Sequence, residues 1–126
     1  MREARIRTFK DLIVWQKAFE LGLQLYRVTR SFPMEERFGL TAELRKTARS
    51  VACNIAEGHR RRSTTEYVRF LDIASGSAAE LATQLLLAGE LRYFDKNQAH
   101  ALRALHGEVE RMLAALMRSL QERASR

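Results

Sequence analysis

Hydrophobic residues recur at helical spacing along almost the whole chain. Between residues 64 and 92 they alternate strictly at spacings of four and three, at Tyr67, Leu71, Ala74, Ala78, Leu81, Leu85 and Ala88. That spacing is typical of the seam of a left-handed helical bundle. A shorter stripe of the same kind lies within residues 42–57, at Leu44, Ala48, Val51 and Ile55. Both patterns predict helices that bury one face.

Two further helices are predicted over residues 11–31 and 96–122. The first carries two neighbouring apolar stripes, Leu12, Trp15, Phe19 and Tyr26, and Val14, Ala18, Leu21, Leu25 and Val28. A face this wide is typical of a helix that touches two neighbours. The second carries a near-heptad stripe of Leu102, Leu105, Val109, Met112, Leu116 and Leu120. Residues 1–8 are expected to fray or fold over the body, and the tail QERASR is expected to fray.

Capping residues stand at the predicted helix boundaries. Pro33 ends the first helix, and Gly58 is expected as the residue just after the second. Ser63 with Glu66, and Asp95 with Gln98, have the spacing of a capping box. The four expected N-caps are Thr8, Thr41, Ser63 and Asp95.

Four helices joined by short links predict an all-α fold, an up-down-up-down antiparallel four-helix bundle forming a single domain over residues 1–126. The helix over 64–92 also has a second stripe that is small in its middle, at Val68, Ser75, Ala79, Ala82 and Leu86, with Gly76 nearby. Small side chains let another helix approach closely. That helix can belong to the same subunit or to a second copy.

Composition agrees with a helical globular domain. The chain has 126 residues, 46% hydrophobic and 29% charged, with one Pro and six Gly. Cys53 is the single cysteine and cannot form an internal disulfide, which favours a reducing compartment. The N-terminus is charged where a signal peptide needs an apolar core, and no apolar run is long enough for a membrane span. We therefore expect a cytoplasmic protein without a membrane partner.

Charge is unevenly distributed along the chain. The formal net charge is +7, and residues 1–63 hold all of it, with 14 Lys/Arg against 7 Asp/Glu. Residues 64–126 hold 8 of each. A basic region of this kind suggests a polyanionic partner, either nucleic acid or an anionic membrane surface. The alternative is a basic protein that has no such partner.

The candidate nucleic-acid-binding residues lie on the second predicted helix and just after Gly58. They are Arg45, Lys46, Arg49, Arg60, Arg61 and Arg62. Lys and Arg bind phosphates with release of counterions, which gives salt-sensitive and sequence-tolerant affinity. In a single subunit the plainer interpretation is that Arg45 pairs with acids on a neighbour and the last three form a solvated loop. Repeated around a symmetric oligomer, the same cluster would create a strong potential.

No catalytic, metal or cofactor site is expected. None of His59, His100 and His106 follows a Glu by three residues, as a di-iron bundle requires. Neither GxxxxGK[ST] nor GxGxxG occurs, and nothing marks a nucleophile, a base and an acid as a set. The sequence therefore predicts a protein that is not an enzyme and needs no cofactor.

Three segments resemble a known family: FKDLIVWQKAFEL (9–21), SFPMEERFGLTAELRKTARSVACNIAEG (31–58) and FLDIASGSAAEL (70–81). They are similar to the four-helix-bundle proteins encoded within bacterial 23S rRNA intervening sequences, a family that includes the accessory protein of diversity-generating retroelements. The resemblance covers roughly residues 9–94. Family members often have Pro where this chain has Ala52, so we expect a straighter second helix here.

The resemblance implies a ring-shaped homopentamer with a basic surface suited to RNA or DNA, and for the retroelement member it implies binding of a reverse transcriptase. It carries no catalytic residues. We therefore predict a non-enzymatic, oligomeric helical bundle that binds nucleic acid. The alternatives are a protein-interaction adaptor for a partner such as a reverse transcriptase, and a structural protein of undefined role.

Overall fold

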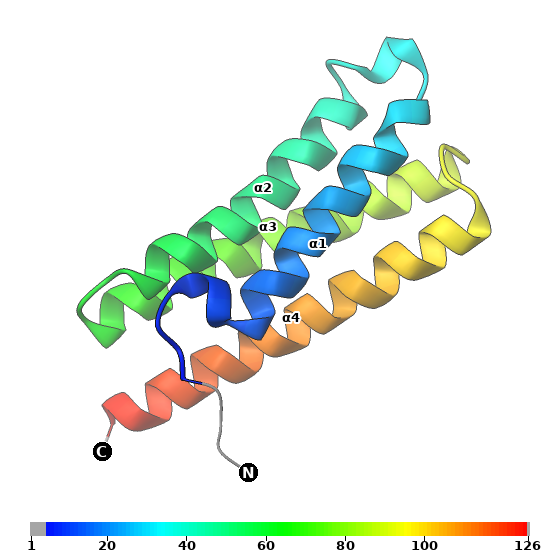
Figure 1. Ribbon diagram of the computed structural model, residues 1–126. Helices are drawn as coiled ribbons and strands as arrows, with labels where there is room; N and C mark the ends of the chain where they lie inside the picture. Colours follow the sequence, from blue (N-terminus) through cyan, green and yellow to red (C-terminus); the bar gives the residue numbers. More distant parts are fainter. Residues whose placement is uncertain (1–4, 126) are drawn as a thin grey trace.

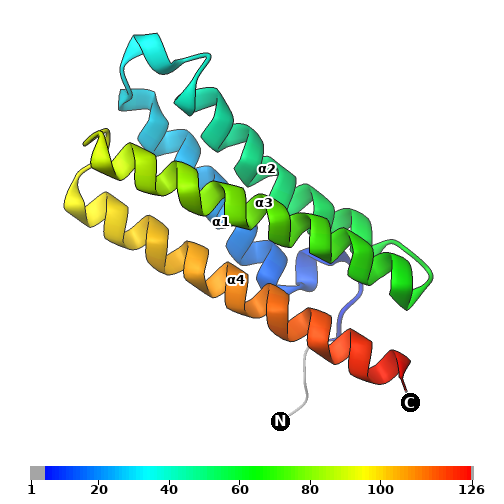
Figure 2. The ribbon, with the colours of Figure 1, turned by 180° about the vertical axis from the view of Figure 1, so that it is seen from behind.

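Four long helices form the body of the molecule. The computed structural model describes residues 5–125, and within them the helices are α1 Ile13–Val28, α2 Leu40–His59, α3 Thr64–Glu90 and α4 Lys96–Ala124. Consecutive helices run in opposite directions and pack against each other, and α4 closes the bundle against α1 (Figure 1). From the opposite side, α3 lies between α2 and α4 (Figure 2). The predicted all-α, antiparallel four-helix bundle is confirmed.

The predicted seams build the core. In α3 every seam residue is buried except Tyr67, which is half-buried, and all four seam residues of α2 are buried. In α1 the stripe that contains Leu21 is buried except for the half-buried Val28, whereas Phe19 of the other stripe is 48% exposed. In α4 Leu113 is buried, and the predicted Met112 is only half-buried. The wide face of α1 is therefore only partly used within one subunit.

Three of the four expected N-caps accept a hydrogen bond where a helix begins. The Ser63 hydroxyl accepts from Glu66 N at 3.1 Å, and Asp95 and Gln98 form a complete capping box. Thr8 caps a short 3₁₀ turn, η1 Phe9–Asp11, and α1 begins later, at Ile13. The predicted start of α1 near residue 11 was therefore too early.

Two boundary predictions for α2 were wrong. Thr41 lies buried inside the helix, and the Leu40 N–H donates instead to the Glu36 carboxylate at 3.0 Å. Gly58 lies within the last turn of the helix rather than after it. A Cβ there would meet the Phe70 Cβ at 2.9 Å, so glycine is needed because α2 and α3 approach closely at this point. The helix accordingly runs two residues beyond each predicted end.

The C-terminal end differs from the expected fraying, whereas the described N-terminal residues follow the other expected alternative and fold over the body. Helix α4 continues to Ala124, through most of the tail that was predicted to fray. The part of the N-terminal prediction that concerns residues 1–4 lies outside the described residues. Residues 5–11 run alongside the end of the bundle, with η1 against α2 (Figure 1). No helix in the described part of the chain is both long enough and apolar enough to cross a membrane.

At the opposite end of the bundle the α1–α2 link packs against the α3–α4 link. Phe32, just after the 3₁₀ turn η2 Thr29–Ser31, packs on Tyr93 with ring centroids 5.1 Å apart. The Tyr93 hydroxyl donates to the Glu36 carboxylate at 2.8 Å. The Leu40 N–H and this hydroxyl lower the pKa of Glu36, and the same hydrogen bond raises the pKa of Tyr93. The α1–α2 and α3–α4 links therefore form one connected surface.

Candidate nucleic-acid interface

Arg45 and Arg49 both reach Tyr26 near the end of α1. The half-buried Arg45 donates from Nε to the Thr29 hydroxyl at 2.9 Å and from Nη2 to the Tyr26 carbonyl at 3.2 Å. Its guanidinium also lies 4.7 Å from the centroid of the Tyr26 ring. Arg49 is exposed and donates to the Tyr26 hydroxyl at 2.6 Å. Arg45 is thus used mainly to join two helices, whereas Arg49 remains accessible.

The hydrogen-bond acceptors of the Arg45 guanidinium are not the acidic side chains that the sequence suggested. The sequence suggested acids on a neighbouring helix, but the side chain binds a hydroxyl and a carbonyl in the last turn of α1. The final carbonyls of a helix lack intrahelical partners, and the negative end of the helix dipole favours a cation there. Arg45 therefore supplies a hydrogen-bond donor and a positive charge to the C-terminal end of α1. Lys46, beside it in sequence, is exposed and forms no ion pair within residues 5–125.

Of the three arginines after Gly58, Arg61 is held in place. It pairs with Glu57, and its guanidinium lies 4.7 Å from the Phe70 ring centroid. Arg69, paired with Glu66, lies 4.6 Å from the same centroid. Arg60 and Arg62 are exposed and form no ion pair in the described part of the chain. The link therefore presents two exposed cations beside one that is held by aromatic and ionic contacts.

The six predicted residues do not form one cluster. With a helical rise of 1.5 Å per residue, Arg49 and Arg60 stand about 16 Å apart along α2. Arg45 and Arg49 contact the end of α1, and Lys46 is exposed beside them, whereas the last three belong to the α2–α3 link. The structure thus separates a side group from an end group.

The end group has basic neighbours that the sequence analysis did not include. We call the basic end the set of residues 5–11, 57–69 and 118–125, which lie together where α2 meets α3 (Figure 1). It holds nine Lys/Arg against four Asp/Glu, a net charge of +5. The opposite end, residues 27–43 and 90–96, holds five of each. The excess charge of the chain is therefore concentrated at one end of the bundle.

Arg5, Arg7 and Lys10 are the added cations of the N-terminal segment, and all three are exposed. The Arg7 N–H donates to the Asp11 carboxylate at 2.8 Å. The backbone N–H groups of Arg7 and Thr8 lower the pKa of Asp11, with a smaller contribution from His59 at the end of α2. The contacts of η1 with α2 place this segment beside the end of α2 and the α2–α3 link (Figure 1). Up-down topology could have indicated this, since it places the start of α1 beside the end of α2.

Other chemistry has little support in the arrangement of side chains. Within residues 5–125, no group of three or more His, Cys, Asp or Glu side chains could hold a metal ion. The buried His106 ring is bonded through Nε2 to the Ala78 carbonyl at 2.7 Å, so it joins α4 to α3. Cys53 is exposed on α2. The most distinctive surface of the described residues is therefore the basic end, which lies on a packed helical bundle.

These features define a class: a small antiparallel four-helix bundle with its positive charge gathered at one end. The chain belongs to the 23S rRNA-intervening sequence protein family, whose model matches residues 10–115. A similar solved structure is that of a protein of unknown function from the S23 ribosomal protein family of Bacteroides thetaiotaomicron, with a TM-score of 0.77. It is 20% identical, and the match covers 84% of this chain and 96% of that one, which establishes the shared fold. No curated protein matches the sequence.

Proposed function

We propose that this protein is a non-enzymatic, oligomeric bundle that binds nucleic acid, with RNA as the first candidate, through the basic end and the side of α2. The observation that carries the proposal is the net charge of +5 at one end of a molecule whose other end is neutral. A concentrated positive surface attracts the phosphate backbone and speeds association with it. The family takes its name from sequences within 23S rRNA genes, which supports RNA and a cytoplasmic setting.

The six candidate residues receive different roles in this proposal. Exposed Lys46, Arg49, Arg60 and Arg62 contact phosphates directly. Arg61 contacts a phosphate or a base from a fixed position, because Glu57 and the Phe70 ring already orient it. Arg45 contributes chiefly by fixing α1 against α2. The exposed cations of residues 5–10 extend the same surface.

Oligomerisation is a separate part of the proposal and rests on the outer face of α3. Ile73 and Leu87 there are 41% and 51% exposed, and the exposed Gly76 and Ala79 lie between them. Large apolar side chains around a small-residue centre suit close packing of a second helix. We propose that a second copy covers this face, and the family resemblance suggests a ring of five. A monomeric mass measured by light scattering at micromolar concentration would refute the proposed oligomerisation.

The test of nucleic-acid binding compares two variants with equal charge changes. The end variant carries Lys10→Gln, Arg60→Gln and Arg62→Gln, and the control variant carries Arg27→Gln, Arg30→Gln and Arg37→Gln at the neutral end. Fluorescence anisotropy with labelled single-stranded and duplex RNA and DNA measures the affinity of each. We expect the end variant to bind at least tenfold more weakly than the control variant. Equal losses in both would show that net charge alone, rather than this surface, governs binding.

A protein-interaction adaptor is the second candidate function. The exposed apolar residues of α1 favour it, since Ile13 and Phe19 are 53% and 48% exposed and Phe19 stacks on Trp15 with centroids 4.9 Å apart. A partner such as a reverse transcriptase would then be captured through this face. Capture of a candidate partner should persist in the end variant and be lost on Phe19→Ser. Capture that survives Phe19→Ser but not the end variant would assign the interaction to the basic end instead.

A further inference from the structure

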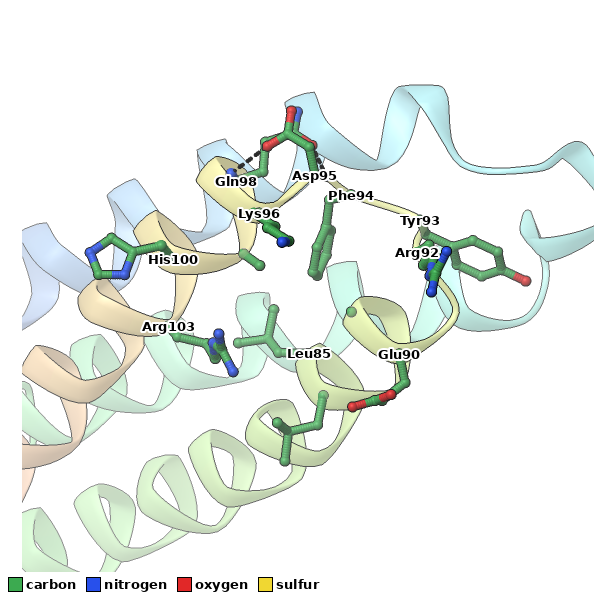
Figure 3. A pocket seen from close by; sticks show the side chains of 13 residues that line it. Leu85, Glu90, Arg92, Tyr93, Phe94, Asp95, Lys96, Gln98, His100 and Arg103 are labelled. Atoms are coloured by element: carbon green, nitrogen blue, oxygen red, sulfur yellow. Dashed lines mark hydrogen bonds between the residues drawn. The ribbon is translucent and has the colours of Figure 1, made fainter.

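An open groove of about 1010 Å³ lies at the neutral end, between the end of α3 and the start of α4 (Figure 3). Its lining includes the apolar Leu85, Leu86 and Phe94. Phe94 is buried and packs against Phe32 of the α1–α2 link, with ring centroids 5.9 Å apart. The neighbouring link therefore holds the apolar wall of the groove in place.

Three permanent cations line the groove. Arg92 comes from the turn, and Lys96 and Arg103 project from α4 (Figure 3). All three are exposed, and none pairs with a carboxylate within residues 5–125. Of the two acids in the lining, Glu90 and Asp95, the second already accepts the Gln98 N–H at 2.7 Å to cap α4. The groove therefore has an unbalanced positive charge although this end of the bundle is neutral.

Arg92 occupies a position that favours glycine. Its φ is 61°, the one positive φ of a non-glycine residue in the described chain. The Arg92 N–H donates to the Gly89 carbonyl and the Tyr93 N–H to the Ala88 carbonyl, both at 3.0 Å, which is the Schellman arrangement at the end of α3. Helices commonly place glycine here, because a side chain is strained in the left-handed region. A strained arginine at the groove therefore requires a reason other than stability.

Lys96 is also placed against the local electrostatic preference. It is the first residue of α4, directly after the N-cap Asp95, which supplies the carboxylate at this helix start. The positive end of the helix dipole favours an anion at that position and disfavours a lysine. Two cations that oppose stability thus lie on the same groove. Local rules are most often broken at functional sites, where a ligand supplies the missing interaction.

We propose that this groove binds the phosphate group of a nucleotide, with Arg92, Lys96 and Arg103 around the phosphate and the base against Leu85, Leu86 and Phe94. The size of the groove suits a ligand of this class. A free mononucleotide and the 5′-phosphorylated end of a nucleic acid present the same chemistry. The site is distinct from the basic end, so the inference does not depend on the proposed function.

Titration calorimetry on the full chain tests the site with adenosine monophosphate, adenosine and inorganic phosphate. Lys96→Gln with Arg103→Gln is compared with Arg27→Gln with Arg111→Gln, which removes equal charge outside both the groove and the basic end. We expect adenosine monophosphate to bind wild type and the control pair, and to bind the groove pair at least tenfold more weakly. Adenosine should bind much more weakly than the monophosphate. Equal affinities of the groove pair and the control pair, or no binding at millimolar monophosphate, would overturn the proposal.

Two further measurements sharpen the result. Arg92→Gly should raise the melting temperature by about 2–6 °C, because it relieves the left-handed residue, while weakening the monophosphate severalfold. A higher melting temperature with unchanged affinity would remove Arg92 from the site. A 5′-phosphorylated oligonucleotide that binds the groove better than its 5′-hydroxyl counterpart identifies a nucleic-acid end as the ligand. Equal binding of the two, with monophosphate binding retained, identifies a free nucleotide.

Discussion

Replacing Gly58 with alanine tests the close approach of α2 and α3 beside the basic end. An added Cβ would lie 2.9 Å from the Phe70 Cβ, 3.1 Å from the Tyr67 Cδ1 and 3.2 Å from the Tyr67 carbonyl oxygen. The first and last of these atoms cannot rotate away, because one is fixed to the backbone and the other belongs to it. Relief therefore requires that one helix shift. We expect Gly58→Ala to destabilise the protein despite the higher helix propensity of alanine.

The expected magnitude follows from two opposing effects. Overpacking a close contact costs typically about 1–3 kcal/mol, and a contact with backbone atoms belongs in the upper half of that range. Alanine recovers about 1 kcal/mol of helix propensity relative to glycine. The net loss is therefore about 1–2 kcal/mol. Gly22→Ala is the matched control, because a Cβ there meets nothing within 4 Å, and it should stabilise by up to about 1 kcal/mol.

Urea unfolding followed by far-UV circular dichroism measures both variants. Protein concentration must be held equal, because any assembly makes the apparent stability concentration-dependent. The account predicts a lower midpoint for Gly58→Ala and an unchanged or higher one for Gly22→Ala, with similar m-values. If Gly58→Ala is as stable as Gly22→Ala, the helices do not approach as closely as described.

Three further changes test the contacts that position the interface. Arg45→Met should cost about 1–3 kcal/mol in urea unfolding, because it removes two hydrogen bonds and a cation–π contact with the end of α1. Exposed Lys46→Met should stay within about 0.5 kcal/mol of wild type. The pKa of Glu36 lies below 4.5, so its stabilising effect is complete above that pH and is lost as pH falls. Glu36→Gln should therefore flatten the acid limb of a pH titration monitored by circular dichroism. Ser63→Ala should lower thermal stability by about 0.5–2 kcal/mol, through loss of the α3 cap.

Hydrophobic periodicity and residue spacing predicted the features that depend on a single helix, namely its buried face and its caps. The seam of α3 is buried almost as expected, and the Asp95–Gln98 capping box formed, because both follow from local spacing. The role of Gly58 could not be found this way. Its environment depends on Tyr67 and Phe70 in the next helix, whose distance from α2 is a property of packing. A glycine near the end of a helical pattern suggested a C-terminal cap. The structure shows that Gly58 is needed instead because α2 and α3 approach closely there.

The candidate interface was predicted in composition but not in shape. Counting charges located the excess of Lys and Arg in residues 1–63. The fold divides the six candidate cations among them between the side of α2 and the basic end. Arg45 was expected to bind nucleic acid or to pair with acids on a neighbour, because nothing in its own helix reveals that its acceptors lie at the end of α1. The groove at the α3–α4 turn was missed because its cations lie in the half of the chain with no net charge.

The salt dependence of RNA binding is the most direct test of the central claim. Affinity for a labelled RNA should fall linearly on a double-logarithmic plot against salt, with a slope of about −0.7 per phosphate contact for a single strand. For the end variant, which lacks three cations, the slope should be shallower by about 2. The control variant from the neutral end should keep the wild-type slope. Absence of RNA binding at low salt, or a slope that the end variant leaves unchanged, would contradict the claim.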